Sequence, residues 1–155
     1  MNFRINALEG SLFSRYFSLS AAELEVHGGR LFTADKSPEY PCRVSLTDAS
    51  VGETVLALPF CHHPVSGPYR SSGPVFVRAN PEQATPAVNE IPELLRHRLL
   101  SVRGYDAQHM MIEADSTMGA QIESVLRSQF ANDGVAYIHI HYAQPGCFSC
   151  AVQRV

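Results

Sequence analysis

The amino-acid sequence predicts a single α+β domain over residues 1–155, built on a mainly antiparallel sheet with about three helices. Its last part is expected to be a C-terminal helix followed by a β-hairpin. Strand-like segments follow one another with short links, which is typical of an antiparallel sheet and not of strands that alternate with helices. Helical periodicity is rare along the chain, and the length is close to the commonest size of one domain.

The first half of the chain contains one clear helix signal. Ser20 and Glu23 have the spacing of a capping box, in which each side chain accepts a hydrogen bond from the backbone N–H of the other residue. Gly28 and Gly29 follow where such a helix would end. The remaining pattern predicts strands at residues 30–34, 42–46, 53–61 and 75–78, with an irregular loop over 62–74.

The second half contains the longest predicted helix. A short helix is expected over residues 92–97, because its first residue is a proline, followed by strands at 99–103 and 110–114. Residues 118–131 then carry an apolar stripe of helical period, with Thr117 as the expected N-cap.

Composition excludes some classes of partner. The net charge is −3, with 12 basic and 15 acidic residues, so there is no basic field for nucleic acid. The longest apolar run, residues 55–61, is too short to cross a membrane, and the N-terminus does not resemble a signal peptide. We therefore expect a cytoplasmic protein with four reduced cysteines.

The C-terminal hairpin is the most informative segment. Strands are expected at residues 135–142 and 147–153, joined by a turn at 143–146. Side chains alternate along a strand, so His139 and His141 share one face, roughly 7 Å apart. Two histidines so placed could act as acid or base near neutral pH.

The pairing of the hairpin strands decides which cysteine lies beside these histidines. A two-residue turn and a four-residue turn both place Cys150 on the histidine face and Cys147 on the other, whereas a β-bulge would exchange them. One alternative is therefore a zinc site made of His139, His141 and Cys150. The sequence favours the other interpretation, in which Cys150 is a small apolar filler beside hydrogen-bonded histidines.

A second candidate lies in the segment 59–74, which contains four prolines, two histidines, one arginine and no acidic residue. Tyr69, Arg70, Ser71 and Ser72 offer a guanidinium and three hydroxyls, which suit a carboxylate or a phosphate. Arg43 could contribute further charge. The plainer alternative is an ordered connector whose Arg70 pairs with a surface acid.

Three functions remain open on these observations. The favoured one is a small-molecule binding protein or enzyme that holds an anionic ligand between this loop and the histidine-bearing strand. The second is the metal-binding protein just described. The third is a non-catalytic interaction module, such as a homodimer formed through an exposed sheet edge. No phosphate-binding loop, dinucleotide fingerprint or nucleophile elbow specifies a reaction.

Several spaced strings also resemble a known family. They are PCRVSLTDA (41–49), SGPYRSSGPVFVR (66–78), YDAQHMMIEA (105–114) and VAYIHIHYAQPGCFSC (135–150). Together they resemble the bacterial family called domain of unknown function 1203 over nearly the whole chain. The resemblance implies a bacterial single-domain protein and supplies no activity, cofactor or catalytic residue. The family's turn commonly reads Asn-Ala-Arg-Pro-Gly-Cys, whereas Tyr142 and Gln144 stand here in place of its Asn and Arg.

Overall fold

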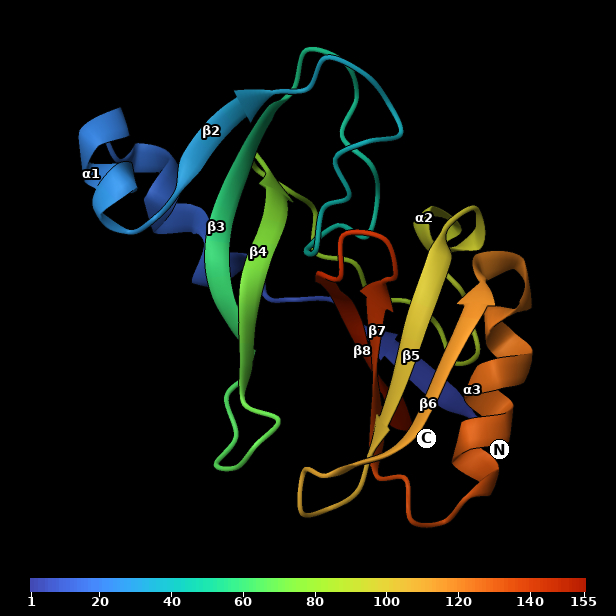
Figure 1. The fold of residues 1–155 in the computed structure, drawn as a ribbon. Coiled ribbons are helices and arrows are strands. Elements are labelled where there is room, and N and C mark those ends of the chain that lie inside the picture. The colour runs from blue at the N-terminus through green and yellow to red at the C-terminus, as the bar shows by residue number, and fades with distance from the viewer.

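A computed structural model describes all residues, 1–155, and shows an α+β fold with two antiparallel sheets (Figure 1). The larger sheet has the strand order β1-β8-β7-β5-β6, and the smaller has the order β2-β3-β4. The strands are β1 (Phe3–Asn6), β2 (Arg30–Thr33), β3 (Thr54–His63), β4 (Ser71–Arg78), β5 (Leu99–Tyr105), β6 (Met111–Met118), β7 (Tyr137–Tyr142) and β8 (Phe148–Arg154). The helices are α1 (Ala21–Val26), α2 (Glu93–Arg96) and α3 (Ile122–Ala131), with short 3-10 turns at Gly10–Leu12, Ser14–Ser18 and Gly119–Gln121.

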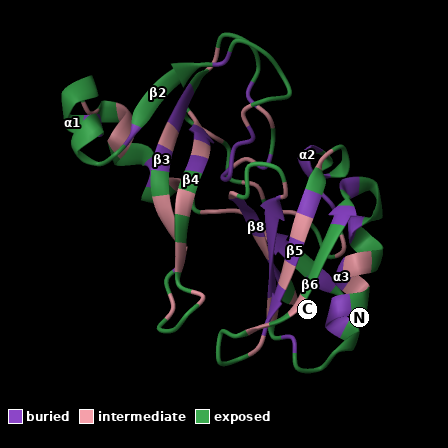
Figure 2. Cartoon of the chain, in the orientation of Figure 1, coloured by how far each residue is buried: buried purple, intermediate pink, exposed green.

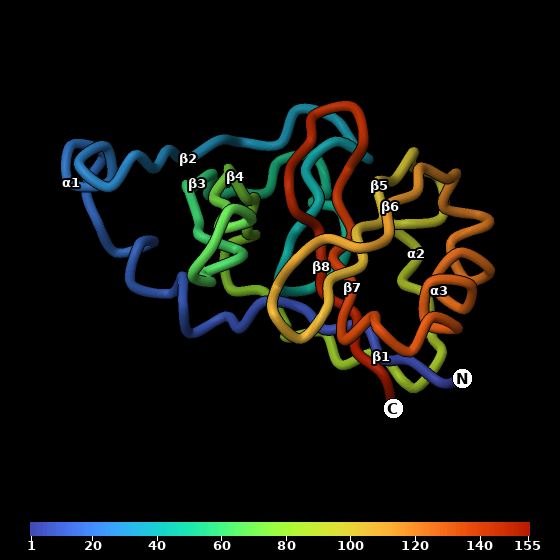
Figure 3. Tube along the Cα trace, turned by 60° about the horizontal axis from the view of Figure 1, so that its bottom comes forward, coloured from blue at the N-terminus to red at the C-terminus, as the bar shows by residue number.

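The larger sheet lies between α3 on one side and the smaller sheet on the other (Figures 1 and 3). Its face toward α3 forms the main core, in which Ile138, Ile140 and Val152 are fully buried against Leu126 and Phe130 of the helix. The purple segments of Figure 2 follow these strands and the inner side of α3. The opposite face of the sheet, turned toward β3 and β4, carries the polar residues described below. No helix is long and apolar enough to cross a membrane.

The predicted α1 helix is confirmed in its detail. The Ser20 Oγ accepts from the Glu23 N–H at 3.3 Å, and the Glu23 carboxylate accepts from the Ser20 N–H at 2.8 Å. Gly28 follows with a φ of 72°, a conformation that costs glycine little. The short helix α2 is also confirmed, with Leu94 and Leu95 buried.

The predicted start of the longest helix is wrong. Met118 is the last residue of β6 and is exposed, so Thr117 lies in a strand and caps nothing. The chain bends at Gly119, whose N–H donates to the Arg98 carbonyl at 2.8 Å. A Cβ at Gly119 would lie 1.7 Å from the Leu95 carbonyl oxygen, so only glycine allows this approach to α2.

Two predictions in the first half also need correction. Residues 42–46 form a turn and not a strand, because Leu46 has a φ of 49° and its N–H donates to the Cys42 carbonyl at 3.0 Å. The loop predicted over 62–74 is shorter, since β3 continues to His63 and β4 begins at Ser71. Pro59 and Pro74 lie opposite each other in this pair, so both missing N–H groups fall at one position of the ladder.

Candidate functional site

The hairpin of β7 and β8 contains a β-bulge, and the bulge decides which residues face the site. At the turn, the Tyr142 N–H donates to the Cys147 carbonyl at 3.0 Å, which matches the four-residue turn. His141 then lies opposite Phe148, but Ile140 lies opposite Cys150, so β8 has one extra residue, Ser149. From Cys150 onward, each side chain of β8 therefore lies on the opposite face from the one that regular pairing predicts.

The alternative metal set of His139, His141 and Cys150 is therefore not assembled in the structure. Cys150 is fully buried in the core with Ile140, on the face away from both histidines, and burial raises the pKa of its thiol to about 12. Phe148 takes the place beside the histidines. No group of three or more His, Cys, Asp or Glu side chains is arranged to hold a metal ion.

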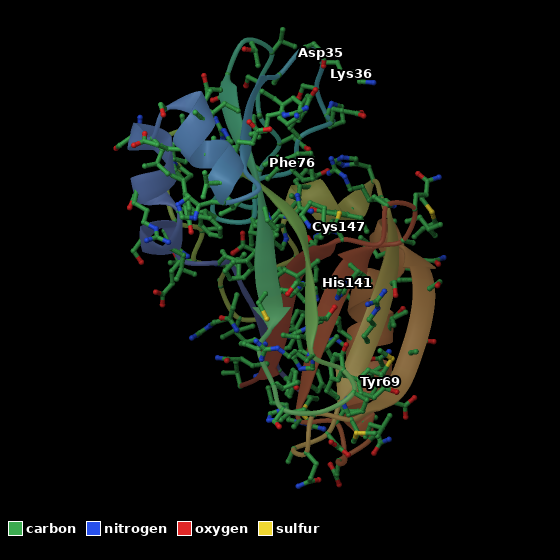
Figure 4. All side chains as sticks on the ribbon, turned by 60° about the vertical axis from the view of Figure 1, so that its left-hand side comes forward. Asp35, Lys36, Tyr69, Phe76, His141 and Cys147 are labelled. Atoms are coloured by element: carbon green, nitrogen blue, oxygen red, sulfur yellow. The ribbon has the colours of Figure 1, made fainter.

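Four histidines instead meet between the two sheets, and we call His62, His63, His139 and His141 the histidine cluster. His139 and His141 come from β7, and His62 and His63 from the last residues of β3. Ring centroids are 4.8 Å apart for His63 and His139 and 5.1 Å apart for His62 and His141. Figure 4 shows His141 near the middle of the molecule and Tyr69 at the end far from Asp35 and Lys36.

Three nitrogens of the cluster are buried without a hydrogen-bond partner: His62 Nδ1, His139 Nδ1 and His141 Nε2. Burial, with neighbouring imidazoles and arginines, lowers the pKa of His139 to about 3 and those of His62 and His141 to about 4. These three rings are therefore neutral at pH 7. The His141 Nδ1 donates to the Gly146 carbonyl at 3.0 Å, so its buried Nε2 carries the lone pair.

Arg103 supplies the charge of this site. It lies directly opposite His139 in the pairing of β5 and β7, and its Nε donates to the Ser101 Oγ at 3.2 Å. Its charge contributes to the lowered pKa values of His62, His139 and His141, so the guanidinium acts on all three rings. No carboxylate forms a salt bridge with it. The site is thus cationic.

A chain of hydrogen bonds extends from the cluster to the surface. The His63 Nδ1 donates to the Tyr69 carbonyl at 2.7 Å, because a carbonyl can only accept. In the neutral ring, His63 Nε2 then accepts from the Tyr137 hydroxyl at 2.6 Å. The Tyr137 oxygen in turn accepts from the Nδ1 of the exposed His109 at 2.9 Å. The Tyr105 ring stacks on that of Tyr137, with centroids 5.3 Å apart.

The structure places the predicted loop residues in different surroundings, and only some of them lie at the histidine cluster. Tyr69 and Ser71 lie at the cluster, through the Tyr69 carbonyl bond to His63 and the pairing of Ser71 with His63. Arg70 is exposed, forms no ion pair, and has only a long contact of 3.5 Å to the Val65 carbonyl. Ser72 faces a separate groove between α1 and the outer side of the smaller sheet.

Arg43, the other predicted anion ligand, lies near the hairpin turn and away from Arg70. It is 1% exposed, and its three nitrogens donate to the Phe148 carbonyl, the Pro41 carbonyl and the Cys147 Sγ at 2.8, 2.6 and 3.1 Å. It borders a cavity of about 650 Å³ that Cys147 and Tyr142 also line. The guanidinium lies 5.0 Å from the centre of the Tyr142 ring.

Sequence reasoning missed Arg103, His62, His63, Tyr137 and His109 as site residues. His62 and His63 were expected in a loop, and Arg103 at the end of an ordinary strand. One signal was available: Tyr137 shares a face with His139 and His141 by simple alternation.

Comparison with known families finds a match over residues 39–154 to a family described as "Protein of unknown function (DUF1203)". No curated protein and no solved structure matches the chain.

Proposed function

The chain belongs to the DUF1203 family, and we propose that its histidine cluster and Arg103 bind a small anionic ligand, one that bears a carboxylate or phosphate group. The site would serve a binding protein or an enzyme for such a ligand. We also propose that the protein is bacterial and cytoplasmic. Fractionation of cells that express the chain would test the cytoplasmic location.

The observation that carries the proposal is Arg103 without an acidic partner beside three buried, unpaired imidazole nitrogens. A buried polar group without a partner costs about 1–3 kcal/mol, so three of them in one place indicate a missing partner. An anion would pair with the guanidinium and would accept hydrogen bonds from the imidazoles once they are protonated. The anion would then supply partners to groups that have none within the protein.

The sign of the charge favours an anion over a metal ion. A divalent cation at the cluster would be repelled by Arg103, and no Asp or Glu side chain is arranged there with the histidines to offset the added charge. An anion has the opposite effect, because it reduces the repulsion that Arg103 exerts on protonated imidazoles. Zinc titration of the parent chain is therefore a useful comparison, and we expect weaker binding of zinc than of the preferred anion.

The test is calorimetric titration with inorganic phosphate, acetate and citrate at low ionic strength between about pH 4 and 6.5, the range in which a bound anion can raise the lowered pKa values of the cluster enough for protonation. We expect Arg103→Met to bind the preferred anion about tenfold more weakly or worse, as the loss of a charge-assisted contact requires. Arg70→Met is the matched control and should bind as the parent does. If Arg70→Met alone loses affinity, the loop is the anion site. If no anion binds the parent, the proposal is wrong.

A further inference from the structure

The hydrogen bonds around Tyr137 form an arrangement that anion binding does not explain. The Tyr137 hydroxyl donates to His63 at 2.6 Å, and His63 is oriented by the Tyr69 carbonyl at 2.7 Å. Hydroxyl, base and orienting acceptor thus follow one another at short distances. This order of groups is the geometry by which a weak oxygen nucleophile is activated, as serine is by histidine and aspartate.

The orientation of each group follows from the backbone carbonyl. Because Tyr69 O can only accept, the His63 Nδ1 keeps its hydrogen and the lone pair of neutral His63 lies on Nε2, toward the phenol. His63 is 3% exposed, so water does not compete freely for that lone pair. The ring is held as a base aimed at one hydroxyl.

His109 supplies a complementary contact at the same oxygen. Its Nδ1 donates to the Tyr137 Oη at 2.9 Å from the loop between β5 and β6. When the phenol loses its proton, this donor is already placed to stabilise the negative charge on the oxygen. His109 therefore has the role of an oxyanion donor and His63 the role of a base.

We propose that Tyr137 is an oxygen nucleophile activated by His63. The proposal deepens the proposed function and rests on it for the substrate class: an anionic molecule held at Arg103 that carries an electrophilic acyl or phosphoryl group. Tyr137 and His139 share a face of β7, with ring centroids 5.4 Å apart, and His139 lies opposite Arg103. A small ligand anchored at Arg103 therefore reaches Tyr137.

The proposed step conserves atoms and charge. The Tyr137 oxygen forms a bond to the acyl carbon or phosphorus, and the leaving group departs with the bonding electron pair. The phenolic proton passes to His63 Nε2, and His63 then returns it to the leaving group or to water. Burial, with Tyr105 and Asp106 nearby, raises the pKa of Tyr137 to about 12, so the phenol is not ionised at rest and the step depends on a base.

The test uses a neutral aryl sulfonyl fluoride, which labels activated phenols and needs no anion site. In this reaction the tyrosine oxygen bonds to sulfur, fluoride leaves, and the proton goes to the base. Labelling is measured at each of the six tyrosines by peptide mass spectrometry. We expect Tyr137 to react about a hundredfold faster than Tyr16, a typical gain from a positioned base. Tyr16 is a suitable reference because its hydroxyl accepts from Arg15, and the neighbouring His27 packs against the Tyr16 ring without a hydrogen bond to the hydroxyl.

A variant at His63 distinguishes a role as base from a purely structural role. His63→Gln retains an acceptor for the Tyr137 hydroxyl but no base. If His63 has only a structural role, labelling of Tyr137 should be unchanged. Our proposal predicts that Tyr137 then reacts no faster than Tyr16. In denaturing urea, the parent chain should also label Tyr137 no faster than Tyr16. This control gives a result even if the variant does not fold. Equal labelling of Tyr137 and Tyr16 in the folded parent overturns the proposal.

The labelling and the anion titration of the parent chain distinguish this inference from the proposed function. The two results are independent because the neutral reagent makes no use of the Arg103 guanidinium. If anions do not bind and Tyr137 still reacts faster than Tyr16, the anionic substrate class is wrong and the activated tyrosine stands. If anions bind and Tyr137 reacts no faster than Tyr16, the activated tyrosine is wrong.

Discussion

Arg103 lies directly opposite His139 across β5 and β7, and this pairing places a cation without a carboxylate partner beside a 6% exposed imidazole. Burial first, and then the neighbouring imidazoles and Arg103, lower the pKa of His139 to about 3. The pair therefore favours a neutral ring in the free protein. An anion that neutralised the arginine would remove one of the effects that keep the ring neutral.

The lowered pKa values predict a stability that rises with pH. Between about pH 4 and 6.5 the unfolded chain binds protons on His62, His139 and His141 that the folded chain does not bind, so acid favours unfolding. One ring whose pKa is lowered to about 4 contributes roughly 3 kcal/mol across this window, and we expect the three coupled rings together to lower the free energy of unfolding by at least that amount. Urea unfolding at a series of pH values measures it. His139→Gln should flatten the curve, and the exposed His27→Gln should not.

Anion binding should be accompanied by proton uptake. A bound anion raises the pKa values of the cluster, because it stabilises imidazolium, so protons enter from solvent as the ligand binds. Calorimetry in two buffers of different ionisation enthalpy, at about pH 5.5, gives the number of protons taken up. Affinity should also fall as the pH rises toward 8. Binding without any dependence on the buffer would show that the histidines do not contact the ligand.

The four thiols should divide into two pairs in the folded protein. Cys61 and Cys147 are half-buried, whereas Cys42 and Cys150 are buried, with the pKa of Cys150 raised to about 12. A disulfide reagent should therefore label Cys61 and Cys147 first and the other two only on unfolding. Cys150→Ala should leave zinc affinity unchanged. A native Cys150 that reacts as fast as Cys61 would place its thiol near the surface, against the β-bulge.

The close approach at Gly119 predicts a large loss of stability from one methyl group. Gly119→Ala places a Cβ against the backbone of Leu95, which cannot move without displacing α2. We expect a loss of about 3 kcal/mol or more, at the upper end for overpacking. Gly73→Ala is the matched control, since nothing lies within 4 Å of a Cβ there and we expect a change below about 0.5 kcal/mol. Equal stability of the two variants would contradict the packing of Gly119 on α2.

The features of the fold that depend on local pattern could be predicted from the sequence. The capping box at Ser20 and Glu23 and the hairpin turn at residues 143–146 depend on neighbours a few positions away, and both are confirmed. The start of α3 depends on a contact between Gly119 and Leu95, which lie far apart in the chain. No periodicity encodes that contact, so the apolar stripe extended the predicted helix into β6.

The candidate site was predictable only in part, for the same reason. Alternation along β7 placed His139 and His141 together, as the structure has them. The presence of His62 and His63 in the site depends on the packing of one sheet on the other. The role of Arg103 depends on the register between β5 and β7. Neither is a property of a short stretch of sequence.

The β-bulge at Ser149 makes the chemistry of the interior depend on strand register at one position. If the same residues paired without the bulge, Ser149 would lie opposite Ile140 and Cys150 opposite His139, which would bring the Cys150 sulfur to the imidazoles and a hydroxyl into the core. A soft-metal ligand set and the present cationic pocket therefore differ by one step of pairing. Among related chains, the presence of this bulge should report on the kind of ligand more directly than the identity of its cysteines.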